Sequence, residues 1–227
     1  MNFNDIVDYL ARFAVLLFIL PMHEFAHAFA AYKNGDYTAK LSGRYTLNPM
    51  KHFDPMGLLC FLIAGFGWAK PVPVNPYNFK NFKKGCFWVS IAGVLTNYIL
   101  AFIFYPLYIL AVSYLPYSNY LARLFIYIFL YGFMFDLSFT VFNLIPVYPL
   151  DGFRLVDTFA KKRGNVYQFL RTKGYFVLFG LIILSNLASR VDALGFLDIF
   201  GYFMNFSVNV IGFPITAFWN FIFGLIG

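Results

Sequence analysis

The apolar stretch IVDYLARFAVLLFILPMHEFAHAFAAY, residues 6–32, decides the fold. It is longer than the roughly 20 residues that a membrane-spanning helix needs. The rest of the chain has the same character, since 61% of its 227 residues are hydrophobic and only 12% are charged, whereas a soluble domain carries about 25% charged residues. So few charges cannot cover a soluble globule, and a disordered chain would be far less hydrophobic. Most of this chain therefore lies in lipid.

Further apolar runs follow the first one. They cover residues 86–115, 121–146, 174–188 and 194–227. Because a helix satisfies all its backbone polar groups within one segment, we predict an all-α polytopic membrane protein with about five to six transmembrane helices. We expect one domain, residues 1–227, with a core of about 6–155 and C-terminal helices within 174–227.

The chain between the first two long runs predicts two smaller features. Residues 40–47 alternate apolar and polar side chains between Gly35 and Asn48-Pro49, which is typical of a short strand or a membrane-associated β hairpin. Residues 56–69 form an apolar run of about 14 residues, which is short for a membrane span. We expect a re-entrant segment there, with a full span as the alternative.

The basic residues indicate the orientation. Segments 33–84 and 147–173 contain 14 of the 17 Lys and Arg residues, and both lie on one side of the membrane if 56–69 is re-entrant. Cytoplasmic loops carry the excess of Lys and Arg, so we expect this side to be cytoplasmic. The net charge of +7 then reflects membrane topology and anionic headgroups, and we expect no nucleic-acid partner.

Chemistry concentrates at the end of the first run, in His23-Glu24-Phe25-Ala26-His27. Residues i and i+4 share one face of a helix, so the two imidazoles can bind one metal ion, and the adjacent glutamate can take a proton from water. The chain has three His residues and a single Glu, and that Glu lies between two of the His. Ionisable groups are costly in lipid and are functional there by default.

Two histidines do not complete a catalytic zinc site, which needs three protein ligands and an open position. The remaining candidates are His52 and the aspartates. Asp151 follows the apolar run at 121–146, after Pro146 and Pro149 interrupt the helix. Its position is consistent with a metal ligand and equally with a helix-end cap, since Asp-Gly also favours a turn.

The two metal motifs together resemble the site-2 protease family, the intramembrane zinc metalloproteases of the M50 type, in its short form without PDZ or CBS domains. The resemblance rests on His23-Glu24-x-x-His27 followed by Asn143-x-x-Pro146-x-x-Pro149-Leu150-Asp151-Gly152. Three further stretches match, namely residues 43–57, 66–76 and 92–97. Together they cover roughly residues 20–155.

The resemblance implies one Zn²⁺ per chain, with His23, His27 and Asp151 as ligands and Glu24 as general base. It implies cleavage of a peptide bond in or near the transmembrane segment of a membrane protein. The expected location is a prokaryotic plasma membrane, in which the protein is multi-pass and its site opens toward the cytoplasm. The sequence leaves the substrate and the oligomeric state open.

Four other polar residues are candidates for the same site. Asn97 and Asn143 are amides in apolar helices, and they either join helices by hydrogen bonds or bind substrate and stabilise the transition state. His52 is a candidate oxyanion donor or a structural histidine of the expected hairpin. Asp136 stands where the family pattern has Asn, either as a second acid or as a buried, protonated hydrogen-bonding group.

Two rival functions remain. One is a zinc-binding membrane protein without proteolytic activity, a metal carrier or a scaffold, although a carrier would show paired halves with matching broken helices. The other is an intramembrane hydrolase that acts on lipid. The strand expected at 40–47 favours a peptide, because an extended substrate can add to a strand edge.

Overall fold

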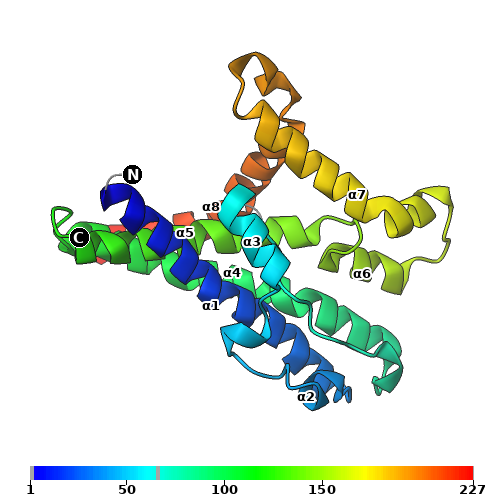
Figure 1. Cartoon of the computed structure of the whole chain (residues 1–227). Helices are drawn as coiled ribbons and strands as arrows, with labels where there is room; N and C mark the ends of the chain where they lie inside the picture. Colours follow the sequence, from blue (N-terminus) through cyan, green and yellow to red (C-terminus); the bar gives the residue numbers. More distant parts are fainter. Residues whose placement is uncertain (1–2, 65–66, 227) are drawn as a thin grey trace. The chain divides into compact units, whose positions relative to one another are not determined.

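The computed structural model describes residues 3–64 and 67–226 and is largely helical (Figure 1). In chain order the elements are α1 (Phe3–Lys33), α2 (Thr38–Leu41), the 3₁₀ turn η1 (Pro49–Lys51), α3 (Pro55–Ala64), η2 (Pro76–Asn78), α4 (Phe82–Tyr114), α5 (Tyr120–Leu144), α6 (Asp151–Phe159), α7 (Asn165–Ala188), η3 (Asp192–Leu197) and α8 (Ile199–Ile226). Within these ranges five helices are long and apolar enough to cross a membrane: α1, α4, α5, α7 and α8. The polytopic all-α prediction is confirmed at this level.

The predicted β hairpin is wrong. No strand occurs in the part of the chain that the structure describes, and one isolated antiparallel bridge joins Phe53 to Ala69. The physical reason is local: the Asp36 carboxylate accepts from the N–H and the hydroxyl of Thr38, which favours a helical turn. The N–H of Ser42 then bonds back to the Thr38 carbonyl, at 3.0 Å, rather than to a neighbouring strand.

The re-entrant segment is not supported either. The structure has the single ten-residue helix α3 in this place, which at 1.5 Å per residue is about 15 Å long. Residues 65–66 of the expected segment lie outside the described residues.

The chain divides into two compact units, Met1–Asp136 and Leu137–Gly227, at a point inside α5. In the first unit α1 packs along α4, as the blue and green helices show in Figure 1. Small side chains allow this close packing, because Ala31 of α1 lies in one buried cluster with Val89 of α4 and Phe79. A second cluster joins Ala28 of α1 to residues that follow α1 in the chain, Ala39 and Val72.

An extended, proline-rich segment, residues 69–78, crosses the first unit. Pro71, Pro73 and Pro76 carry no N–H and force the residues before them into extended conformations. Most of the remaining N–H groups of the segment therefore bond to separate, unrelated acceptors rather than in a ladder. The N–H of Lys70 bonds to the His52 carbonyl at 2.8 Å, and the N–H of Asn75 bonds to the Asp36 carboxylate at 2.8 Å.

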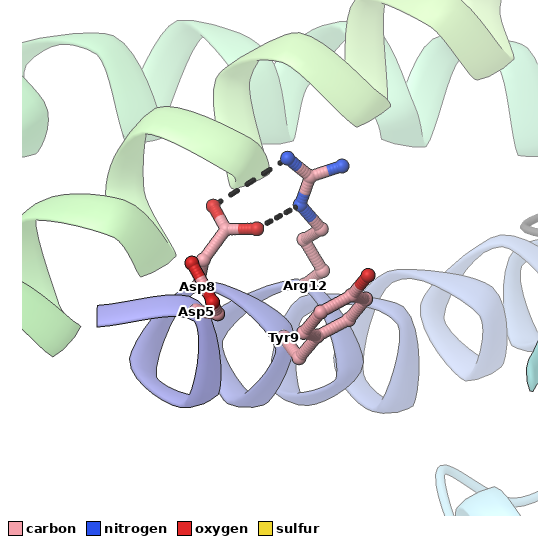
Figure 2. A pocket seen from close by; sticks show the side chains of 4 residues that line it. All are labelled: Asp5, Asp8, Tyr9 and Arg12. Atoms are coloured by element: carbon pink, nitrogen blue, oxygen red, sulfur yellow. Dashed lines mark hydrogen bonds and ion pairs between the residues drawn. The ribbon is translucent and has the colours of Figure 1, made fainter. Parts of the chain in front are cut away.

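A polar cluster joins the start of α1 to α5 within the first unit. Figure 2 shows Asp8 and Arg12 facing each other one turn apart, with Nε of Arg12 2.8 Å from Oδ2 of Asp8. The hydroxyl of Tyr131 on α5 donates to Asp8 and accepts from the Arg12 guanidinium, which also stacks over its ring at 4.5 Å. These directional contacts hold the start of α1 against α5.

The second unit contains the end of α5, then α6, α7, η3 and α8. Helix α5 ends at Leu144, just before Pro146, as the prolines predict. The chain then turns back, so that a Cβ on Gly152 would lie 2.3 Å from the Leu144 carbonyl oxygen. Only glycine permits this close approach, and it sets the start of α6 directly against the end of α5.

Candidate metal centre

The two histidines of α1 form a buried pair. The side chains of His23 and His27 lie one helical turn apart, and their Nε2 atoms are 3.0 Å from each other. Tetrahedral zinc with Zn–N bonds of about 2.0–2.1 Å holds two nitrogen ligands about 3.3 Å apart. The two rings therefore lie on one face of α1, close enough to share one cation, while their part as ligands stays a prediction.

The opposite ring nitrogens are held by α4. Nδ1 of His27 lies 2.6 Å from the backbone carbonyl oxygen of Val89, which accepts hydrogen bonds only, so this Nδ1 carries the proton. Nδ1 of His23 lies 3.1 Å from Oδ1 of Asn97. Donation from both Nδ1 atoms leaves the lone pairs on the two Nε2 atoms, which is the tautomer that binds a metal.

This arrangement fits a metal ion. Two nitrogen lone pairs 3.0 Å apart repel each other unless a cation or a proton lies between them. Each imidazole also donates its other N–H to an oxygen, as metal-bound histidines do in general. Neutral imidazole nitrogens are common ligands of zinc.

Gly93 makes room for the pair. A Cβ built on Gly93 would lie 2.4 Å from Cε1 of His23 and 2.5 Å from Nε2 of His27. Val89, Gly93 and Asn97 are spaced four residues apart on α4, so they form one stripe on the face of α4 toward α1. Along this stripe the Val89 carbonyl accepts from His27, Gly93 leaves space for both rings, and the Asn97 amide oxygen accepts from His23.

Glu24 is anchored by the proline-rich segment. Its Oε2 accepts a hydrogen bond from the backbone N–H of Val72 at 2.8 Å. Glu24 follows His23 directly on α1, and this bond fixes its carboxylate against the proline-rich segment. Sequence reasoning identified Glu24 but not Val72, since a backbone donor leaves no mark on residue type.

Asn97 and Asp136 are two further buried polar residues of the first unit that interact with His23. Asn97 is fully buried and holds the His23 ring, as described above. Asp136 on α5 is also fully buried and interacts electrostatically with His23. Neither of its carboxylate oxygens has a hydrogen-bond partner among the residues that the structure describes.

His52 is placed differently. Its ring is buried, and its Nε2 lies 2.8 Å from the Thr46 carbonyl oxygen. Its own carbonyl accepts from Lys70. These contacts join two loops of the first unit, and a part for His52 as an oxyanion donor stays a prediction.

The last two predicted site residues belong to the second unit. Asn143 lies in the last turn of α5, where its Nδ2 donates to the Phe139 carbonyl at 3.1 Å. Asp151 is the first residue of α6, is buried, and has Arg154 at 3.7 Å. The prolines and Gly152 thus fix Asp151 at the tight turn between α5 and α6, while its part as a ligand stays a prediction.

Several known proteins are similar to this chain in sequence. A family model described as "Peptidase family M50" matches residues 11–187. "Putative zinc metalloprotease YwhC" of Bacillus subtilis (strain 168) is 42% identical over 183 residues, which are 78% of this chain and 81% of the relative. "Putative zinc metalloprotease Rip2" of Mycobacterium tuberculosis (strain H37Rv) is 30% identical over 171 residues, 73% of this chain and 62% of the relative.

No solved structure matches the chain significantly. The family match and the 42% identical relative each cover more than two thirds of the chain. This chain therefore belongs to peptidase family M50, a family of zinc metalloproteases.

Proposed function

We propose that the chain is an intramembrane endopeptidase that cleaves membrane proteins in or near their transmembrane segments, with His23, His27 and Asp151 as the ligands of one Zn²⁺. The convergence of the two Nε2 atoms, with Glu24 anchored at the neighbouring position of α1, carries this proposal. The bound ion supplies Lewis-acid activation of a water molecule and of the scissile carbonyl.

The protein's own groups do the remaining work. Glu24 accepts the proton of the attacking water and delivers it to the leaving amide nitrogen. Oε2 is held by Val72, so Oε1 is the oxygen that moves the proton. The hydrogen bonds to Asn97 and Val89 keep both imidazoles in the ligand tautomer throughout.

The membrane setting follows from the helices. His23 lies ten residues before the end of α1 at Lys33, which is about 15 Å along the helix axis. We infer that the site lies below the membrane surface and opens to the side that bears segments 33–84 and 147–173. This side is cytoplasmic by the positive-inside rule, and the membrane is a prokaryotic plasma membrane.

The decisive experiment compares wild type with Glu24→Gln. Purified protein in detergent is incubated with a model transmembrane peptide, with and without a chelator, and its zinc content is measured. We expect wild type to cut the peptide, the chelator to stop the reaction, and Glu24→Gln to retain zinc but leave the peptide intact. A Glu24→Gln protein that cleaves at the wild-type rate refutes the proposal.

The ligand set has its own test. Asp151→Ala should lower the zinc content from about one per chain, whereas loss of activity with unchanged zinc content would remove Asp151 from the ligands. A wild-type protein that binds zinc but cuts neither peptide nor lipid would favour the carrier or scaffold function.

Orientation is tested by labelling. In a chain without Cys60 and Cys86, a cysteine at the exposed Ser42 should resist an impermeant maleimide applied to spheroplasts. A cysteine at Ser118, which is exposed beyond the far end of α4, should react. The reverse pattern would place the site on the outer side.

A further inference from the structure

The N–H of Val72 is an isolated backbone donor. Its neighbours Pro71 and Pro73 have no N–H, so Val72 carries the one backbone donor of the tripeptide 71–73. That donor bonds to Oε2 of Glu24 across 48 residues of sequence, at 2.8 Å. The contact therefore joins a rigid, extended stretch to the glutamate of the HExxH motif.

The segment around Val72 is held from both sides. Upstream, the Arg44 guanidinium donates to the Lys70 carbonyl and approaches the Pro71 carbonyl at 3.4 Å. Downstream, the Asp36 carboxylate accepts from the N–H of Asn75, at 2.8 Å.

Side-chain packing fixes the same point. The Val72 side chain is buried in one cluster with Ala28 of α1 and Ala39. The position of the Val72 N–H is thus fixed by the hydrogen bonds upstream and downstream of it and by the packing of its own side chain.

We propose that the Val72 N–H is the positioning group of the general base. A glutamate side chain has three rotatable bonds, and a hydrogen bond that fixes Oε2 holds the carboxylate in one orientation. A misplacement of about 1 Å in a catalytic group can reduce the rate by about 100-fold. The inference rests on the proposed role of Glu24 and adds the residue that orients it.

The kinetic test removes the N–H donor of residue 72 while the backbone stays extended. Val72→Pro keeps an extended conformation and deletes the N–H. We expect kcat to fall about 100-fold, with KM and zinc content close to wild type. Val72→Ala keeps the N–H and measures the loss of side-chain packing by itself.

Val74→Pro is the matched control, because it adds a proline to the same segment at an N–H that makes no hydrogen bond to any described residue. It should retain activity. A Val72→Pro enzyme with wild-type kcat overturns the proposal, as does an equal loss in Val74→Pro.

Hydrogen exchange tests the contact without catalysis. The Val72 amide should be protected in wild type and in Glu24→Gln, whose side-chain carbonyl still accepts, and should exchange at least tenfold faster in Glu24→Ala. The Asn75 amide, which bonds to Asp36, should stay unchanged as an internal control. Equal Val72 exchange in Glu24→Ala and wild type overturns the proposal.

The two proposals fail in different ways. If no transmembrane peptide is cut by wild type, the proposed function is lost, yet the Val72 exchange pattern still reports the contact. If the peptide is cut but Val72→Pro is as fast as wild type, only the positioning role is lost.

Discussion

Replacing Gly93 by alanine adds one methyl group at the point where α4 meets the imidazole pair. The added carbon would lie 2.4–2.6 Å from three ring atoms of His23 and His27, whereas ordinary contact begins at 3.4 Å. The rings or the helices must therefore move by about 1 Å. The crowded atoms include both Nε2 nitrogens, so the displacement falls on the ligand atoms themselves.

The expected magnitude follows from this displacement. A shift of about 1 Å in positioned groups typically costs about 100-fold in rate, and disturbed partners of metal ligands cost about 10–100-fold in metal affinity. Alanine in a helix interior is otherwise better than glycine by about 1 kcal/mol. Gly93→Ala should thus lose zinc affinity without a matching loss of helix content.

Zinc affinity is measured by competition with a chromophoric chelator, and helix content by circular dichroism in detergent. The matched control is Gly180→Ala in α7, where an added Cβ meets no atom within 4 Å. Gly180→Ala should bind zinc like wild type. Wild-type zinc affinity and cleavage in Gly93→Ala would show that the imidazoles do not rest on Gly93, and would refute the reasoning.

Three further predictions concern polar contacts of the first unit. Burial tends to raise the pKa of Asp36, but the hydrogen bonds from Thr38, Asn75 and Asn78 lower that pKa below its usual 3.8. The contribution of the Asp36 carboxylate to stability is therefore present above about pH 4 and is lost as the pH falls further. Thermal unfolding in detergent should show this loss of stability at acid pH in wild type but not in Asp36→Asn. Asn97→Leu should weaken zinc binding about 10–100-fold, measured by chelator competition, and unchanged affinity would remove the amide from the support of His23. Tyr131→Phe should lower the free energy of unfolding by about 1 kcal/mol or less, because Arg12 and Asp8 stay paired near solvent. The zinc affinity of this variant should equal that of wild type.

The local parts of the site were predictable from the sequence. His23, Glu24 and His27 depend on the i, i+4 geometry of one helix, which any long apolar helix provides. The end of α5 before Pro146 is likewise a property of proline itself. Such predictions need no knowledge of how distant segments meet.

The hairpin prediction was wrong because it used residue alternation and ignored one side chain. The alternation at 40–47 is genuine, but Asp36 lies just upstream and captures the Thr38 N–H and hydroxyl. One short helical turn then replaces the first strand. Asp36 also accepts from Asn75 and Asn78, which are 39 and 42 residues further on, and no local pattern predicts such partners.

The supports of the metal centre are hidden from sequence for a further reason. His27 is held by the carbonyl of Val89 and Glu24 by the N–H of Val72, and every residue has a carbonyl while every residue but proline has an N–H. The residue types at 72 and 89 are therefore set by packing, since both side chains are buried. What the centre requires at these positions is backbone direction, which α4 supplies through its helical register and the segment 69–78 through its prolines. It follows that a register shift of α4, or a lost donor between Pro71 and Pro73, would disable the site while every residue of the HExxH motif stayed in place.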